Sequence, residues 1–220
     1  MAISTLPPVA LTQVHLSPGS HLLIEGVSWE QYEAFLEELG EERRVPRINY
    51  CDGILELMSP LPAHERPHRI IAHILVALLD AQERAWEDFG STTFRKPKRA
   101  GLEPDTCFYI QHAPQVCSHM RMDMEVDPPP DLAIETDVTS KTTFDAYATL
   151  EVPELWIYEN RRLRIYLLTP EGYRDSTVSL VFPEVDILTL IPERVERAFE
   201  VGTSQMLREF RASLQASSAP

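Results

Sequence analysis

Two short apolar runs near the middle of the chain decide the fold, EPDTCFYI at residues 103–110 and PDLAIETDV at residues 130–138. Each run has the composition of a short β-strand and carries carboxylates at one end or inside it. A carboxylate in an otherwise buried strand costs free energy unless it is paired, hydrogen-bonded or bound to a metal ion. The two runs therefore predict that Asp105 and Glu135 converge on one site.

A β-hairpin is predicted upstream of these strands. Asp52-Gly53 is a strong signal for a two-residue turn, and the segments 47–51 and 54–58 on either side of it read as strands. Glu56 lies inside the second segment and faces away from the leucines beside it. Two roles stay open for Glu56: a residue on the solvent side of an edge strand, or a third carboxylate of the site.

Several helices are predicted from apolar residues at helical spacing. Ser28 and Gln31 form a capping-box pattern at the start of the first helix, and Gly40 ends it. A long helix with a broad apolar stripe covers about residues 64–86. Shorter helices are predicted at about residues 141–150 and 204–214.

The order of these elements predicts an α/β (α+β) fold, with a mixed central sheet flanked by helices and an N-terminal helix and hairpin as an extension. Residues 1–25 read as an irregular arm and residues 26–200 as a single domain. Residues 201–220 read as a C-terminal helix with a disordered tail from residue 216.

The composition narrows the class of protein. With 220 residues, 44% of them hydrophobic and 25% charged, the chain suits one globular domain. A formal net charge of -14 argues against a basic face for nonspecific nucleic-acid binding. The best candidate for a local basic cleft is the run of Arg95, Lys96, Lys98 and Arg99, and a solvated turn is the alternative.

The cysteines and the lengths of the apolar runs indicate in which cellular compartment the protein is expected. Cys51, Cys107 and Cys117 have no paired spacing, which suits a reducing compartment. Zinc is not expected, because Cys117 and His119 have no second pair of ligands nearby. The sequence shows no signal-peptide pattern and no run long enough to span a bilayer, so we expect a cytoplasmic protein without a membrane partner.

Histidines gather at the start of the long helix. His64 and His68 are four residues apart and could share a helix face, as metal ligands do. No glutamate stands in the metalloprotease arrangement, so we assign these histidines capping and surface roles.

Asp105 and Glu135 offer the ligands that a hard divalent cation prefers. Mg²⁺ usually takes one or two carboxylates together with water and phosphate oxygens. A metal ion there would polarise a phosphodiester and lower the pKa of a bound water, and a nearby lysine would stabilise the developing charge. Simpler roles stay open: Asp105 could cap a turn, and Glu135 could pair with Arg95 or Lys96.

Four motifs resemble those of a known family, in the same order. They are LELMSPLP at 55–62, GLEPD at 101–105, IETDVTS at 134–140 and YATLEVPELW at 147–156. Over about residues 29–173 the chain resembles the Uma-two family of bacterial restriction-endonuclease-like proteins, a branch of the PD-(D/E)xK nuclease superfamily. The resemblance implies a restriction-endonuclease-like core, a Mg²⁺ or Mn²⁺ site and DNA as the substrate. It makes Asp105 the metal-binding aspartate and Glu135 its acidic partner, and it matches Glu56 and the His64-Glu65 pair to recurrent positions.

The chain departs from the family pattern where a basic residue is expected. The E-x-K pattern places a lysine two residues after Glu135, and Asp137 stands there. The family's basic residue, four before the tyrosine that matches Tyr147, corresponds to Thr143, whereas Lys141 lies six residues before it. Lys141 could substitute, Asp137 could become an extra metal ligand, or the chain could fold like a nuclease and cut poorly.

We therefore expect a metal-dependent DNA endonuclease that uses Mg²⁺ or Mn²⁺. Its expected catalytic residues are Asp105, Glu135, Lys141 and Glu56, and its expected metal ligands are Asp105, Glu135 and Asp137. Two alternatives are a catalytically inactive nuclease-fold protein with a binding or regulatory role, and a metal-dependent phosphodiesterase acting on nucleotides or RNA. A homodimer is a further expectation.

Overall fold

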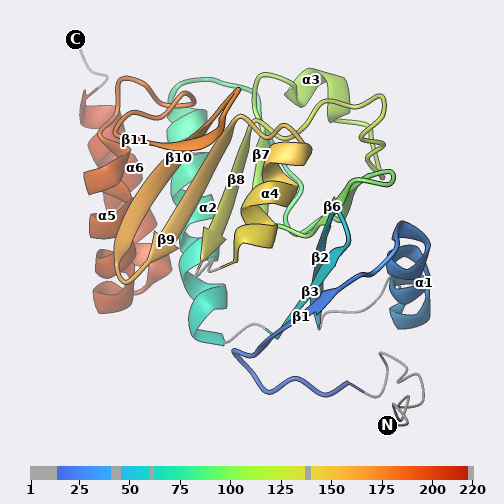
Figure 1. Ribbon diagram of the computed structural model, residues 1–220. Helices are drawn as coiled ribbons and strands as arrows, with labels where there is room; N and C mark the ends of the chain where they lie inside the picture. The colour runs from blue at the N-terminus through green and yellow to red at the C-terminus, as the bar shows by residue number, and fades with distance from the viewer. Residues whose placement is uncertain (1–13, 41–45, 60–61, 137–139, 218–220) are drawn as a thin grey trace, which may run out of the picture.

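The computed structural model describes residues 14–40, 46–59, 62–136 and 140–217. Within these ranges the chain forms two β-sheets, and helices cover or separate them (Figure 1). The predicted mixed α/β fold is confirmed. No helix in the described ranges is long and apolar enough to cross a membrane.

The larger sheet is the mixed sheet that the sequence predicts. Its strands, in spatial order, are β11 (Gly172–Ser176), β10 (Arg162–Thr169), β9 (Glu154–Glu159), β8 (Leu132–Thr136), β7 (Thr106–Tyr109) and β4 (Glu87–Asp88). Strands β8 and β9 are parallel, and all other neighbours are antiparallel. A parallel pair needs a crossover connection, and the helix α4 (Lys141–Thr149) supplies it.

The smaller sheet is antiparallel throughout. Its strands, in spatial order, are β1 (His21–Glu25), β3 (Ile54–Met58), β2 (Arg47–Cys51), β6 (Ala100–Leu102) and β5 (Phe94–Lys96). Strands β2 and β3 form the predicted hairpin around Asp52-Gly53, where both residues have positive φ angles. Because β2 also pairs with β6, the hairpin is built into a five-stranded sheet.

The expectation of an irregular arm up to residue 25 was wrong for residues 21–25. These residues form β1, which pairs with β3 along its whole length. The strand is short, lies at the edge of the sheet and has one exposed face, so its sequence carries only a weak strand pattern. Residues 1–13 of the predicted arm lie outside the described residues.

The helices are α1 (Trp29–Leu39), α2 (Pro62–Ala81), α3 (Ala113–Val116), α4 as above, α5 (Ile187–Val201) and α6 (Thr203–Ser217). Helices α1 and α4 agree with the predictions, α2 ends at Ala81 instead of about residue 86, and α3 was not predicted. The capping box of Ser28 and Gln31 at α1 is confirmed. Helix α5 was not predicted: Pro192 lies inside it, where proline normally breaks a helix, but Asp186 caps its N-terminus. The disordered tail was wrong for residues 216–217, which belong to α6.

Three apolar clusters hold the layers together. One face of the larger sheet packs against α2, α5 and α6, and its other face packs against α4 and the smaller sheet. The far face of the smaller sheet packs against α1. The ring of Tyr32 lies against Gly101, and a side chain at position 101 would collide with it. The chain crosses from the smaller sheet to the larger between β6 and β7, and this crossing contains Asp105.

Candidate functional site at the junction of the two sheets

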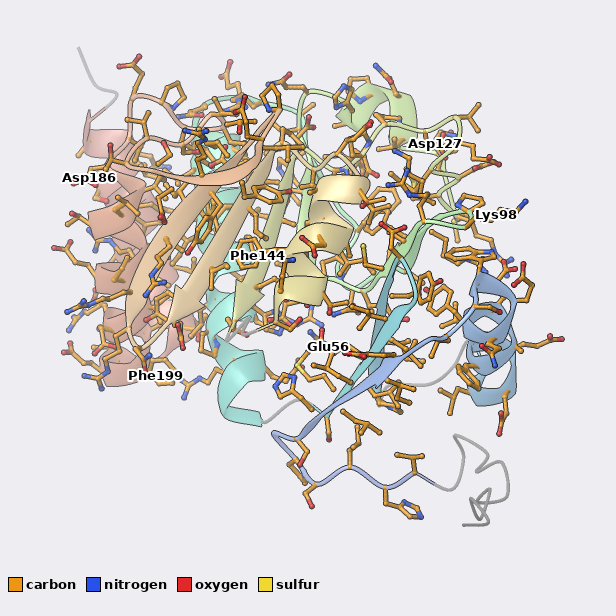
Figure 2. All side chains as sticks on the ribbon, in the orientation of Figure 1. Glu56, Lys98, Asp127, Phe144, Asp186 and Phe199 are labelled. Carbon is orange, nitrogen blue, oxygen red and sulfur yellow. The ribbon has the colours of Figure 1, made fainter. Side chains whose placement is uncertain are left out.

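Three of the predicted site carboxylates lie where the two sheets meet. Asp105 lies on the crossing from β6 to β7, Glu135 on β8 and Glu56 on β3. Their exposed fractions are 5%, 3% and 3%, so all three are buried. Figure 2 shows Glu56 between the smaller sheet and α4. The prediction that Asp105 and Glu135 converge agrees with a hydrogen bond from the Asp105 backbone N–H to Glu135 Oε2, at 3.3 Å.

Asp105 connects both sheets with helix α2. Its Oδ2 accepts hydrogen bonds from the backbone N–H of Thr136, at 2.7 Å, and from Thr136 Oγ1, at 2.6 Å. Its Oδ1 forms an ion pair with Arg47, the first residue of β2. Arg47 also donates to Glu65 Oε1 near the start of α2, at 2.9 Å. Asp105 is thus held by charged and neutral donors, and it does more than cap a turn.

Glu135 is buried, and its neighbours shift its pKa in opposite directions. Burial raises its pKa from 4.5 to about 7, and the nearby Glu56 carboxylate adds to this rise. A hydrogen bond from the Tyr147 hydroxyl of α4 and the charge of Arg47 act in the other direction. This carboxyl group therefore holds its proton more tightly than an exposed glutamate does.

Of the two suggested partners of Glu135, Arg95 and Lys96, the structure contradicts Lys96. Lys96 Nζ instead donates to the backbone oxygen of Thr149 and pairs with Glu151 at 3.4 Å. Arg99 pairs with Asp52 at 3.2 Å. These four charged side chains border a pocket of about 470 Å³ beside α4. Both acidic and basic side chains line this pocket, so the run does not form a purely basic cleft.

The suggestion that Glu56 faces solvent was also wrong. Leu55 and Leu57 pack on the α1 side of the smaller sheet, so the alternation of the strand turns Glu56 toward α4. Glu56 Oε2 accepts hydrogen bonds from Ser140 Oγ, at 2.7 Å, and from Thr143 Oγ1, at 2.9 Å. Because β1 covers the outer side of β3, Glu56 is not on an edge strand either.

The positions expected to supply a basic group have different surroundings. Thr143 is buried, and its hydroxyl bonds to Glu56 and lies 3.4 Å from Asn49 Nδ2. Lys141 is the first residue of α4; its side chain is 91% exposed, and its Nζ lies 3.8 Å from Asp145. Its assisting role stays a prediction. Asp137 lies outside the described residues.

The structure adds three polar residues to the site: Arg47, which the sequence did not single out, and Glu65 and Tyr147, which matched family positions without an assigned role. Arg47, Glu65 and Tyr147 contact the carboxylates directly or through one another. The surface role assigned to His68 was wrong: it is fully buried, and its Nε2 lies 3.1 Å from Glu65 Oε2. Burial lowers the pKa of its imidazole. The side chain of His64 lies outside the described residues.

The donor set fits a hard divalent cation. Arg47 is a buried guanidinium that pairs with Asp105, and His21 Nδ1 lies 3.4 Å from Glu56 Oε1. The carboxylate oxygens of Glu56, Asp105 and Glu135 are the kind of atom that Mg²⁺ and Mn²⁺ prefer. However, within the ranges that the structure describes, no three His, Cys, Asp or Glu side chains already surround one point as a metal site. Asp105 is engaged on both oxygens, by Arg47 and by Thr136.

Comparison with known proteins gives the family. The Uma2 (Uma-two) family model, described as "Putative restriction endonuclease", matches residues 29–200. The chain belongs to the Uma2 family. A solved structure described as a "putative nuclease belonging to DUF820" from Anabaena variabilis ATCC 29413 is 14% identical to this Uma2 chain, with a TM-score of 0.49. That alignment covers 82% of this chain and 99% of the other. No curated protein matches the sequence significantly.

The Uma2 match includes every element that builds the junction except β1. The four motifs at 55–62, 101–105, 134–140 and 147–156 contribute Glu56, Asp105, Glu135 and Tyr147 in turn. Motifs that are far apart in the sequence therefore meet at one buried site.

Proposed function

We propose that this Uma2 protein is a metal-dependent DNA endonuclease whose Mg²⁺ or Mn²⁺ is held by Asp105 and Glu135, with Asp137 as a further ligand. The main support is the crowding of three buried carboxylates at the junction, with a single buried guanidinium in contact with them among the described residues. Such an arrangement is unfavourable unless a cation offsets the remaining charge. Membership of a restriction-endonuclease family supports the reaction and the substrate.

In this proposal the surrounding residues orient the acidic groups. A bound divalent cation would supply a water of lowered pKa and would polarise the scissile phosphodiester. Thr136 fixes the Asp105 carboxylate, and Tyr147 fixes that of Glu135. Glu56, held by Ser140 and Thr143, is proposed to accept a proton during the reaction. Lys141 is proposed to assist from the start of α4.

Cleavage of supercoiled and linear plasmid with Mg²⁺ or Mn²⁺ tests this function. We expect metal-dependent nicking by the wild type and its loss in Asp105→Ala and Glu135→Ala. Asp131→Asn is the matched control, because Asp131 is also buried but contacts a different part of the larger sheet. Cleavage that persists in both site variants would contradict the proposal. Parallel assays with RNA and a small phosphodiester separate a DNA endonuclease from the nucleotide or RNA phosphodiesterase.

The second candidate is a catalytically inactive nuclease-fold protein with a binding or regulatory role. The observations that favour it are Thr143 at the expected basic position, the exposed side chain of Lys141 and the net charge of -14. A folded wild type that binds Mn²⁺ and leaves plasmid, RNA and small phosphodiesters intact would support this candidate.

Two expectations remain predictions, the homodimer and the cytoplasmic location. Sedimentation equilibrium tests the first, with a mass of two chains as the expected result. Fractionation of the source cells tests the second.

A further inference from the structure

Arg47 is the strongest unassigned feature of the junction. It lies at the start of β2, is 8% exposed, and bridges two carboxylates that come from different layers. One terminal nitrogen contacts Asp105, and the other donates to Glu65 at 2.9 Å. Buried arginines are usually fixed by such pairs, so the contacts alone do not separate a structural role from a functional one.

The surroundings of Arg47 suggest the functional role. Lys141 extends into solvent and pairs with Asp145, and the family's basic position is a threonine bonded to Glu56. The guanidinium of Arg47, in contrast, already lies against the aspartate that the proposed function assigns to the metal. A guanidinium also presents its donors as a planar fork that matches two oxygens of one phosphate.

The contact between Arg47 and Asp105 conflicts with a metal ion at Asp105. Asp105 Oδ2 is engaged by Thr136, and Oδ1 is engaged by Arg47. A divalent cation that uses Oδ1 therefore has to displace the guanidinium, since two positive groups cannot share that oxygen closely. Glu65 is partly exposed, with 41% of its side chain accessible. Its ion pair with Arg47 would be retained after the guanidinium leaves Asp105.

We propose that Arg47 is the phosphate-binding residue of this site, and that Asp105 masks it until a divalent cation takes its place. In the metal-free protein Arg47 neutralises Asp105. Once the cation occupies Asp105, the freed guanidinium binds an oxygen of the nucleic-acid phosphate beside the metal. The inference rests on the proposed function, because it uses the same cation site.

The masking model and a purely structural role predict opposite effects on metal affinity. If Arg47 competes with the cation, its removal strengthens metal binding. If Arg47 only ties β2 to Asp105 and α2, its removal disturbs the junction and leaves metal affinity unchanged or weaker.

The first experiment titrates Mn²⁺ alone, without nucleic acid, into the wild type and Arg47→Met by calorimetry. We expect Arg47→Met to bind Mn²⁺ about tenfold more tightly, because a competing positive charge is gone. Arg47→Lys keeps the charge and is expected to stay near the wild type. Arg84→Met is the matched control: Arg84 is half-buried, bonds to the Val181 backbone oxygen and lies beyond the opposite end of α2 from Glu65.

The second experiment measures binding of a short labelled DNA duplex in Ca²⁺, which is expected to occupy the site without supporting cleavage. Arg47→Met should lose on the order of tenfold in duplex affinity when Ca²⁺ is present, because a charge-assisted contact to phosphate is gone. It should lose little when Ca²⁺ is absent, since Asp105 then masks the arginine. An equal loss in both conditions would overturn the inference.

The outcomes separate this inference from the proposed function. If the wild type and Arg47→Met bind Mn²⁺ equally well, the metal site stands and the masking role of Arg47 falls. If neither binds Mn²⁺, the proposed function and the inference fall together. If Arg47→Met alone binds Mn²⁺, the inference is supported and the wild-type site is shown to be blocked by its own arginine.

Discussion

Buried carboxylates occur in two kinds of place in this molecule, and their partners differ. Asp131 and Glu154 each have their own set of donors, and Asp131 Oδ1 also lies 2.7 Å from His112 Nδ1. Asp131 Oδ2 accepts from three successive backbone N–H groups at residues 110–112, at 2.6 to 3.2 Å. Glu154 accepts from Trp156 Nε1 and from the backbone N–H groups of Leu180 and Val181. These two acids fasten loops to the larger sheet.

The junction carboxylates are arranged differently. Glu56 lies close enough to Glu135 to raise the pKa of Glu135, and Asp105 pairs with the Arg47 guanidinium in addition to its hydrogen bonds from Thr136. The comparison shows that burial alone does not mark a functional acid. The proximity of several buried acids, with a guanidinium among them, is what distinguishes the junction.

The largest expected effect is on DNA cleavage, which should depend on the junction carboxylates and not on Asp131 or Glu154. Asp105→Asn keeps the shape of the side chain and removes its charge, so we expect metal-dependent cleavage to fall by on the order of 10²–10³-fold. Glu154→Gln should leave cleavage per folded molecule unchanged. Rates measured on plasmid, normalised to the folded fraction from circular dichroism, check this. Equal losses in the two variants would remove the distinction between the groups.

The second prediction concerns stability, where the larger loss is expected for Glu154 and not for the junction carboxylates. Glu154→Ala leaves Trp156 Nε1 and the Leu180 N–H without their acceptor, whereas the Val181 N–H keeps Ser179 Oγ, so we expect it to lower the free energy of unfolding by about 3 kcal/mol. Glu135→Gln keeps the size of its side chain and removes a charge that burial disfavours, so we expect no loss in metal-free protein at pH 8. Urea unfolding with a chelator present measures both. A larger loss for Glu135→Gln than for Glu154→Ala would contradict the account.

The third prediction concerns the pH dependence of metal-free protein. The pKa of Glu135 is about 7 in the folded state, against an ordinary value of 4.5, so the folded state holds this proton more tightly than the unfolded state. Its contribution to stability is therefore full below pH 4.5 and is lost as the pH rises to 7, by about 3 kcal/mol. The difference in unfolding free energy between the wild type and Glu135→Gln isolates this effect. A difference that stays constant across that range would count against a buried, crowded Glu135.

The smallest expected effect concerns the cysteines near the junction. Cys51 and Cys107 are buried, and burial raises the pKa of both thiols, whereas Cys117 is exposed. Ellman's reagent should therefore modify one thiol quickly in native protein, and Cys117→Ser should remove that fast reaction. Fast modification of Cys107, two residues after Asp105, would show that the junction opens readily.

Much of the site could be predicted because its signals are local. The strands that carry Asp105 and Glu135 are short apolar runs with acids in them, and their conflict with burial can be read from the sequence. The Asp52-Gly53 turn fixed the hairpin and therefore the position of Glu56 on β3. The alternation of the strand gives the side on which Glu56 lies, but its burial could not be predicted, because it depends on α4 and β1 packing against β3.

The missed residues depend on contacts between distant segments. Arg47 and Asp105 are far apart in the sequence and meet only because β2 pairs with β6 just before the chain enters β7. A signal was nevertheless present: Arg47 opens a strand that is otherwise largely apolar, and a buried arginine needs an acidic partner. His68 likewise shares a helical stripe with Ile71 and Leu75, which are buried.

The most direct test of the account is the anomalous scattering of Mn²⁺ in crystals of the wild type and Asp105→Asn. We predict an anomalous difference peak between the carboxylates of Asp105 and Glu135 in the wild type, with Arg47 turned away from Asp105. We predict a much weaker peak, or none, in Asp105→Asn. A fully occupied wild-type peak elsewhere, or none at the junction at saturating Mn²⁺, would contradict the claim that these crowded acids form a cation site.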